Sequence, residues 1–396
     1  MMSMRKSVFV SVFIAFMAFV ANAQTFYRDA KNPEMMRPVG YQDDYRKEII
    51  LPQVNGYNVY KADLHTHTIF SDGQVMPELR VREAWKDGLD VIAITDHIEY
   101  RRHESTLVEY LNKYVSKKHK EAVNHKISDG EITKDGIMVD LNTSVRMAEK
   151  SAKNYGLTII PGTEITRNVS VAGHYNALFT TDNNLIFDTD AYQSIRNAKS
   201  QGALVMHNHP GWRKTSLDYS ELDQKVYGEG LIDGVEVMNG NEFYPGIIDR
   251  VMEKGIFIAA NSDIHATTSE EYRAVGYDRP MTLILAKDKS LASLREALEH
   301  NRTLAYGYGT LSGAEQLLTD FFLASVKVES IAPATVLLTN LSSVSYTLRR
   351  GKGTQIILPP MASIRLSAGK DATSIKLQVL NMWSGADRHP EVKIQF

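Results

Sequence analysis

The sequence predicts an α/β protein built as a closed β/α barrel. Short apolar segments alternate with helical segments, and polar or charged residues follow the carboxyl end of nearly every apolar segment. Continuous apolar strands separated by helices are typical of a parallel sheet that is buried on both faces. In β/α barrels the carboxyl ends of the strands form the functional face. Because five or more segments carry such residues, a barrel is favoured over an open sheet.

The first β-α-β unit shows the pattern clearly. Residues 59–64 predict a strand that leads directly into a histidine. Pro77 opens the following helix and Gly88 closes it, which are the usual positions for these two residue types. Residues 89–95 predict the next strand. Further strands are expected over 157–160, 203–206, 234–238, 256–260 and 281–286, with a helix over 291–298.

The first 23 residues have the three parts of a secretory signal peptide. Arg5 and Lys6 supply the basic region, residues 8–20 are apolar, and Ala21-Asn22-Ala23 fits the small-x-small cleavage rule. The apolar run is short for a membrane span. We therefore expect cleavage after Ala23 and a periplasmic or secreted location, with an uncleaved membrane anchor as the alternative.

The rest of the chain divides into three parts. Residues 24–57 are polar and aromatic with little periodicity, and they predict an N-terminal arm over the barrel of residues 58–324. Within the barrel, about 100–155 are charged and mostly helical in pattern, too long for an ordinary βα loop, so a helical insertion near the barrel mouth is expected. Residues 325–396 contain short, partly alternating apolar runs, which predict a small antiparallel β domain.

Composition narrows the possible functions. The 396 residues are 43% hydrophobic, carry a formal net charge of −2 and include no cysteine. No basic domain is present, so neither nucleic-acid nor membrane binding is expected. A small phosphate ester remains a possible substrate, because bound metal ions can supply positive charge locally. The absence of cysteine excludes zinc ribbons, and the oligomeric state stays open.

Three histidine-bearing clusters are the main candidate functional residues, and further candidates lie between and beside them. The nine candidate metal ligands are His65, His67, Asp72, His97, Glu164, His174, His209, Asp263 and His265. Imidazole and carboxylate donors suit Mn, Zn or Fe. One ion takes roughly four to six ligands, so nine predict two or three divalent ions sharing a bridge.

The spacing of these residues supports shared ions. His65 and His67, two apart on an extended segment, point to the same side and could hold one ion. Asp72 follows in a turn, close enough to reach a neighbouring ion. Glu164 ends another strand, where its carboxylate could bridge two ions.

The chemistry that needs such a cluster is hydrolysis of a phosphate ester. The ions would lower the pKa of a bridging water, and the resulting hydroxide would attack phosphorus while the ions stabilise its oxygens. The catalytic candidates are Asp263, Glu164 and His207, the last as a proton donor to the leaving group.

Several neighbouring residues have two possible roles. His174 is either a ligand or a core imidazole, and His207 competes with His209, although Pro210 favours His209 as the ligand. Asp96 is expected to orient a histidine rather than bind an ion. For a further set of residues two roles are open: contact with the substrate or the ligands, or an ordinary structural role. These residues are Arg101, Arg102, Trp212, Arg213, Lys214, Asn239 and Asn261.

These motifs resemble those of the polymerase and histidinol phosphatase (PHP) superfamily, and they occur in the family's order over roughly residues 58–310. The motifs are His65-Thr66-His67, Ser71-Asp72-Gly73, Thr95-Asp96-His97, Gly162-Thr163-Glu164, His209-Pro210 and Ser262-Asp263-Ile264-His265. The resemblance implies a distorted seven-stranded β/α barrel. Asp72 stands where many members have histidine, which puts affinity for a third ion in doubt.

The resemblance also implies how the ligands divide among ions. The first ion would take His65, His67, Glu164 and Asp263, the second Glu164, His174 and His209, and the third Asp72, His97 and His265. The signal peptide and β domain look more like exported phosphodiesterases of this superfamily. The alternatives are a phosphomonoesterase for periplasmic sugar or nucleotide phosphates, and a catalytically silent barrel with a binding β domain.

Overall fold

The computed structural model describes residues 26–38, 45–103, 126–128, 131–133, 140–166, 173–368 and 372–396. The chain forms two compact units, Met1–Tyr45 and Arg46–Phe396. In the first unit β1 (Phe26–Arg28) pairs with β2 (Met36–Pro38). The predicted signal peptide lies outside the described residues. Among the residues described, no helix has the length and apolar character needed to cross a membrane.

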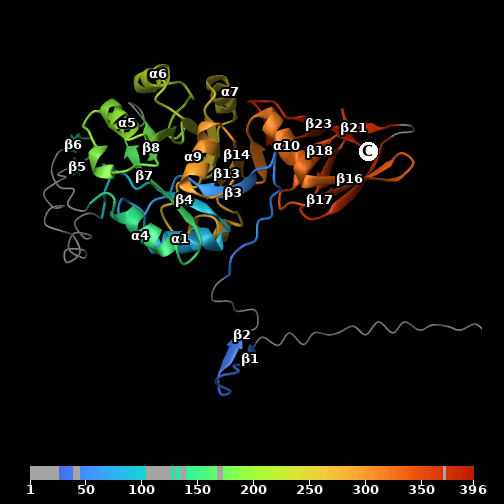
Figure 1. Ribbon diagram of the computed structural model, residues 1–396, viewed down its shortest axis with the longest axis horizontal. Helices are drawn as coiled ribbons and strands as arrows, with labels where there is room; N and C mark the ends of the chain where they lie inside the picture. The colour runs from blue at the N-terminus through green and yellow to red at the C-terminus, as the bar shows by residue number, and fades with distance from the viewer. Residues whose placement is uncertain are drawn as a thin grey trace, which may run out of the picture. The chain divides into compact units, whose positions relative to one another are not determined.

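The second unit contains one large mixed sheet with helices packed on it, so the α/β prediction is confirmed (Figure 1). Its strands are β3 (Asn58–Asp63), β4 (Val91–Ile94), β7 (Thr158–Thr166), β8 (His174–Leu178), β9 (Leu204–His207), β10 (Gly234–Asn239), β11 (Glu242–Phe243), β12 (Phe257–Asn261), β13 (Met281–Ala286), β14 (Thr303–Gly307), β15 (Thr310–Ser312) and β22 (Met382–Trp383). Their order is β11-β10-β9-β8-β7-β4-β3-β13-β14-β15-β22, with β12 on β10.

The sheet is not parallel throughout, unlike the expected pattern. β3, β4 and β7 are parallel neighbours, as are β9, β10 and β12. However, β8 runs antiparallel between β7 and β9, and β13 runs antiparallel to β3. The cause for β8 is connection length: only seven residues separate Thr166 from His174, and a parallel crossover needs about a dozen or more.

Seven strands and one helix meet in a single buried apolar cluster, the interior of the distorted barrel. Its members come from β3, β4, β7, β8, β9, β12, β13 and α9 (Leu291–Glu299) and their flanks, and include Ala62, Val91, Ile160, Leu178, Met206, Phe257, Ile284 and Leu298. Between β12 and β13 the Thr282 hydroxyl bonds both the amide and the carbonyl of Ala260, each at 3.0 Å. Side-chain bonds thus help to close the barrel there.

Helices pack around the barrel, and one of them, α9, also contributes to the interior cluster. They are α1 (Pro77–Lys86), α4 (Thr143–Ala152), α5 (Ala191–Ser200), α6 (Glu221–Gly228), α7 (Pro245–Lys254), α8 (Thr268–Glu271), α9 and α10 (Glu315–Ser325), with 3₁₀ turns η1 (Asn183–Leu185) and η2 (Arg273–Val275). α1 begins at Pro77, as predicted, and buries Val81 and Ala84 against the sheet. Ser220 and Asp223 form a capping box that starts α6.

The expected helical insertion needs two corrections. Residues 126–128 and 131–133 pair as strands β5 and β6 rather than as helix. Helix α4 is not part of an insertion, because it packs on α1 and β7 and forms the crossover between β4 and β7. The remainder of 104–139 lies outside the described residues.

The C-terminal part contains two small antiparallel sheets. One holds β16 (Val326–Ala332), β17 (Thr335–Asn340) and β20 (Ser363–Ser367), and the other holds β18 (Tyr346–Arg349), β19 (Gln355–Leu358), β21 (Ser374–Val379) and β23 (Glu391–Gln395). Strand β22, which lies between β21 and β23 in the chain, instead pairs in parallel with β15 of the barrel sheet. Residues from α10, these sheets and the barrel share one apolar core.

The second half of the predicted N-terminal arm lies on this unit. The Lys47 amide donates to the Lys86 carbonyl at 2.8 Å, and Arg46 pairs with Asp90 at 2.8 Å. The Ile50 amide donates to Ser343 Oγ at 2.9 Å. Residues 46–50 therefore contact both the barrel and the C-terminal part.

Replacing Gly234 by alanine should destabilise the barrel. A Cβ at this buried position would lie 2.2 Å from two ring atoms of Phe257, whose side chain has no exposed surface. We expect the free energy of unfolding in urea to fall by about 1–3 kcal/mol, the usual cost of overpacking. Gly228→Ala, with nothing within 4 Å of the new methyl group, is the control. Equal stabilities of the two variants would contradict this packing argument.

Candidate metal centre

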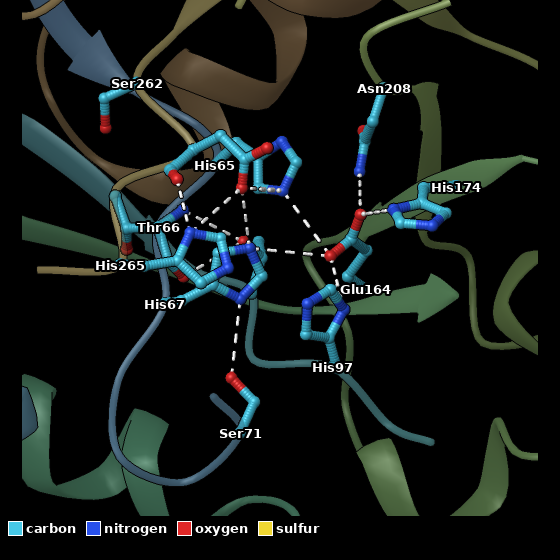
Figure 2. A network of polar contacts seen from close by, with 12 residues as sticks. His65, Thr66, His67, Ser71, His97, Glu164, His174, Asn208, Ser262 and His265 are labelled. Atoms are coloured by element: carbon cyan, nitrogen blue, oxygen red, sulfur yellow. Dashed lines mark hydrogen bonds and ion pairs between the residues drawn. The ribbon is translucent and has the colours of Figure 1, made fainter. Parts of the chain in front are cut away.

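The nine candidate ligands converge at one rim of the barrel. Figure 2 shows His65, His67, His97, Glu164, His174 and His265 there. His65 and His67 follow β3, Asp72 lies in the next turn, His97 follows β4, Glu164 lies in β7, His174 begins β8, His209 follows β9, and Asp263 and His265 follow β12. His174 is at the amino end of its strand and still reaches this rim because β8 runs antiparallel to β7.

The ligand atoms form three overlapping groups, in each of which all atoms lie within 4.8 Å of one another. The groups are His67, Asp72, His97 and His265; His65, Glu164 and His209; and His65, His67 and Asp263. They differ from the division implied by the motifs in three ways. His67 also joins the Asp72 group, and Glu164 is missing from the group of His65, His67 and Asp263. His65 takes the place of His174 beside Glu164 and His209, although His174 Nδ1 lies 3.0 Å from Glu164 Oε1.

Glu164 occupies the middle of the cluster, and its side chain is fully buried. Its Oε1 lies 3.0 Å from His174 Nδ1 and 3.8 Å from His209 Nε2. Its Oε2 lies 3.5 Å from His65 Nε2 and 2.6 Å from His97 Nδ1. Because each oxygen faces different histidines, the carboxylate has the placement that a bridging ligand requires.

Both carboxylate oxygens of Asp263 lie close to histidines. Its Oδ1 lies 3.2 Å from His65 Nε2 and 3.0 Å from His67 Nε2, and its Oδ2 lies 3.7 Å from His209 Nε2. Asp263 and His209 have positive φ angles of 53° and 25°. Such backbone conformations are strained in residues other than glycine and cluster at functional sites.

The group that contains Asp72 is built around stacked histidine rings. The His67 ring stacks on His97 and His265 at centroid distances of 4.4 and 4.3 Å. Asp72 Oδ1 lies 3.4 Å from His97 Nε2 and 3.2 Å from His265 Nε2. The aspartate, although shorter in reach than a histidine, therefore contacts both of its expected partners.

The electrostatics of the cluster keep its carboxylates ionised. Burial alone would raise the pKa of Glu164, but the neighbouring His97 and His65 hold it well below its usual value. Burial would also raise the pKa of Asp263, but the charge of His65 outweighs that effect, so the pKa of Asp263 is far below its usual value. Burial and the charges of His265 and His97 lower the pKa of His67 to about 4, so its imidazole is neutral and able to donate a lone pair.

Unsatisfied buried atoms show that this donor set fits divalent ions. Among the described residues, His65 Nε2, His67 Nε2 and Asp72 Oδ1 are buried without a hydrogen bond. A buried polar atom without a partner carries a free-energy cost, which coordination would remove. The donors are nitrogen and oxygen atoms, as divalent ions such as Mn, Zn or Fe accept. The identity of the metal stays a prediction.

Asp96 organises the turn between His67 and Asp72, which agrees with the supporting role expected for it. Its Oδ1 accepts the Thr68 amide at 2.7 Å and the Ser71 hydroxyl at 2.8 Å. Ser71 Oγ in turn lies 3.4 Å from His67 Nδ1. A carboxylate acting through a neighbour in this way fixes the orientation of a ligand ring.

His207 contacts side chains that are not among the nine candidate ligands. Its Nδ1 lies 3.1 Å from the Tyr227 hydroxyl, its ring stacks on Tyr175 at 5.1 Å, and its Nε2 lies 3.7 Å from Asp223. Burial lowers its pKa to about 4, which leaves the ring neutral at physiological pH. These contacts support a structural position for His207, and its role as a proton donor stays a prediction.

The loop after His209 places an aromatic ring beside two ligands. The Trp212 ring centroid lies 5.5 Å from that of His174 and 5.2 Å from that of His209. The guanidinium of Arg213 lies over Trp212 at 4.3 Å, whereas Lys214 Nζ lies 3.7 Å from Asp223. Of the basic residues considered in the sequence, Arg101 donates to the His97 carbonyl at 3.3 Å, and Arg102 donates to the Tyr100 hydroxyl at 2.9 Å.

Two supporting residues, Asn208 and Glu236, were not predicted. Asn208 donates to Glu164 Oε1 at 2.9 Å, and Glu236 contacts His65 Nδ1 at 2.9 Å. Asn239 and Asn261, for which two roles were open, both donate to Glu236. The available signal for Glu236 was a charged residue inside the apolar run 234–238, since buried carboxylates are almost always paired.

The fold and donor set together define an α/β-barrel protein with a cluster of candidate divalent-metal sites. The family model described as the PHP domain matches residues 63–252. A two-domain protein containing a predicted PHP-like metal-dependent phosphoesterase, from Bacteroides vulgatus ATCC 8482, has a crystal structure that is 31% identical with a TM-score of 0.76. That match covers 90% of this chain and 100% of the other. This chain therefore belongs to the PHP family, whose phosphoesterases are metal-dependent.

More distant structures also match. A putative metal-dependent phosphoesterase from Bifidobacterium adolescentis is 16% identical over 52% of this chain and 88% of its own, with a TM-score of 0.36. An amidohydrolase from Chromobacterium violaceum is 13% identical over 53% and 89%, with a TM-score of 0.35. At these values neither likeness carries an argument. No curated protein matches the sequence significantly.

Proposed function

We propose that this PHP-family protein hydrolyses phosphodiesters with two or three divalent ions held in the candidate metal centre. The observation that carries this proposal is the sharing of ligands: His65 belongs to two of the three groups, and Glu164 faces histidines with both oxygens. Shared ligands place neighbouring ions close together, as in two-metal phosphoesterases. Bound ions would supply Lewis acidity toward the phosphoryl oxygens and would acidify water.

The protein's own residues would hold and orient this centre. Asp263 and Glu164, the carboxylates predicted to be catalytic, would act by keeping two negative charges at fixed positions among the histidines. Asn208 restrains Glu164 through its 2.9 Å hydrogen bond to Oε1. No serine or cysteine nucleophile is needed for this chemistry, because the ions supply the activation.

The side chains next to the ligands favour a diester. A phosphodiester carries one negative charge and an organic group on each side, and the Trp212 ring, next to His174 and His209, offers an apolar surface to such a group. The nearby Lys214 is already close to Asp223. A phosphomonoesterase is the second candidate, because the Arg213 guanidinium over Trp212 would suit a doubly charged phosphate.

We also propose export to the periplasm or outside the cell, with Mn, Zn or Fe as the bound metal. The support for export is the N-terminal sequence of basic, apolar and small-x-small segments ending at Ala23. The support for these metals is the mixture of imidazole and carboxylate donors.

The mature protein, loaded separately with Mn, Zn and Fe, should hydrolyse bis(p-nitrophenyl) phosphate faster than p-nitrophenyl phosphate. Release of p-nitrophenolate would be followed for both substrates, with the same protein stripped by a chelator as the control. Faster turnover of the monoester would favour the second candidate. A loaded protein that turns over neither ester would remove the phosphoesterase proposal for these substrates.

A further inference from the structure

Glu236 is a charged residue in the middle of the apolar strand β10. Its side chain is fully buried, yet the carboxylate is surrounded by four polar groups. Oε1 lies 2.9 Å from His65 Nδ1 and accepts Asn261 Nδ2 at 2.9 Å. Oε2 accepts the His209 amide at 2.7 Å and Asn239 Nδ2 at 2.8 Å. Four donors satisfy an ionised carboxylate inside a protein core.

The contact with His65 determines which ring nitrogen is free. An ionised carboxylate only accepts hydrogen bonds, so Nδ1 of His65 must carry the proton in the 2.9 Å contact with Glu236. Metal binding requires a neutral imidazole, and a neutral ring with its proton on Nδ1 presents the lone pair of Nε2. That nitrogen lies 3.2 Å from Asp263 Oδ1 and 3.5 Å from Glu164 Oε2, and it makes no hydrogen bond among the described residues.

The other oxygen of Glu236 restrains a second ligand through the backbone. Its 2.7 Å bond to the His209 amide fixes the residue where the chain leaves β9 with a positive φ of 25°. Asn261 extends the same network, since its Oδ1 accepts the Leu64 amide at 2.8 Å. One carboxylate therefore ties together the ends of β3, β9, β10 and β12, and candidate ligands follow β3, β9 and β12.

We propose that Glu236 is a positioning residue that sets the tautomer of His65 and the backbone position of His209 for divalent-ion binding. The proposal rests on the metal centre of the proposed function and adds a determinant of its metal affinity. Carboxylate partners of this kind fix the ring orientation of a ligating histidine and raise its basicity. Glu236 itself would touch neither ion nor substrate.

Glu236→Gln is the sharpest test, because it keeps the shape of the side chain. The amide has one oxygen and one NH₂ group, so either the His65 Nδ1–H or the His209 N–H must face a donor. We expect the affinity for Mn²⁺ and Zn²⁺, measured by competition with a chelating indicator, to fall by roughly 10–100-fold. Glu253→Gln, the same change at an exposed position of α7, should leave the affinity unchanged.

Unfolding of the metal-free proteins separates positioning from a purely structural role. A structural role would lower the stability of metal-free Glu236→Gln while leaving its metal affinity at the wild-type value, and that result would overturn the proposal. If Glu236→Gln does not fold, Asn239→Ala gives the answer, because it removes one donor to the same carboxylate and leaves His65 untouched. We expect a smaller loss of affinity in Asn239→Ala, and wild-type affinity there would overturn the proposal.

The affinity measurement is independent of catalysis. A wild-type protein that binds ions but hydrolyses neither test ester would end the proposed function, while a weakened Glu236→Gln would still support the positioning role. A wild-type protein that binds neither Mn²⁺ nor Zn²⁺ would overturn the positioning role directly.

Discussion

Replacement of Asp263 by asparagine should lower phosphodiester turnover on the order of a thousandfold, equivalent to about 4 kcal/mol of transition-state stabilisation. Asp263 lies within 3.7 Å of His65, His67 and His209, so its negative charge is shared by two ligand groups. Asparagine is the suitable replacement because, like aspartate, it tolerates the positive φ of 53° found here. Turnover of bis(p-nitrophenyl) phosphate and metal content should be measured on the same samples.

The matched control is Asp218→Asn, which changes an exposed aspartate that bonds Ser216. It should retain wild-type turnover and metal content. If Asp263→Asn kept both its metal and its turnover, Asp263 would not be a ligand of the working centre. A metal site formed by Asp263, His65 and His67 would then be contradicted.

Replacement of Arg279 by methionine should cause the largest loss of stability outside the barrel interior. The buried guanidinium bonds Asp87 Oδ2 at 3.0 and 2.8 Å and Asp63 Oδ2 at 3.2 Å. Removing it leaves Asp63 without its cation and takes one of two arginines from Asp87, which keeps its contact with Arg273. Loss of one partner of a buried ion pair typically costs about 3–5 kcal/mol, so urea denaturation should show a decrease of this size in the free energy of unfolding.

The defect should depend on pH with a defined sign. Burial raises the pKa of Asp63 even with Arg279 beside it, and removing the cation would raise that pKa further. Below the unfolded pKa of about 4 the carboxyl is protonated in both states and costs little. The difference in the free energy of unfolding between wild type and Arg279→Met should therefore grow as pH rises toward the higher pKa that Asp63 has in the folded variant.

A surface arginine provides the comparison for this variant. Arg196→Met alters an exposed guanidinium on α5, and such substitutions usually change stability by less than about 0.5 kcal/mol. Equal losses of unfolding free energy in the two variants would contradict a role for the uncompensated Asp63 carboxylate. A loss in Arg279→Met that does not change with pH would contradict it as well.

Much of the barrel, and the convergence of the candidate ligands that follow its strands, could be predicted from the sequence because both depend on local patterns. Apolar strands are identified by composition, and their carboxyl ends must meet at one rim of a β/α barrel. His65 and Asp263, almost two hundred residues apart, could be joined by that rule alone, and their atoms lie 3.2 Å apart. His174 begins the antiparallel strand β8, so this rule does not explain why it reaches the same rim.

What the sequence did not reveal depends on long-range geometry. The antiparallel direction of β8 follows from a short connection and not from the residues of the strand itself. The role of Glu236 could not be predicted because a single carboxylate in an apolar strand does not indicate which histidine it contacts. The contacts of His207 were also hidden, since alternation places a side chain on one face of a strand but does not name the tyrosines that cover it.

Strand β22 makes the C-terminal part a structural continuation of the barrel. Met382 and Trp383 pair with Leu311 and Ser312, and an unpaired sheet edge is a template for association with other chains. A gene shortened to end near codon 325 would leave this edge open and strip apolar cover from α10, so its product should aggregate. In evolution, loss of the tail would have to be matched by a new cover for the same edge, so the two parts are expected to be inherited and lost together.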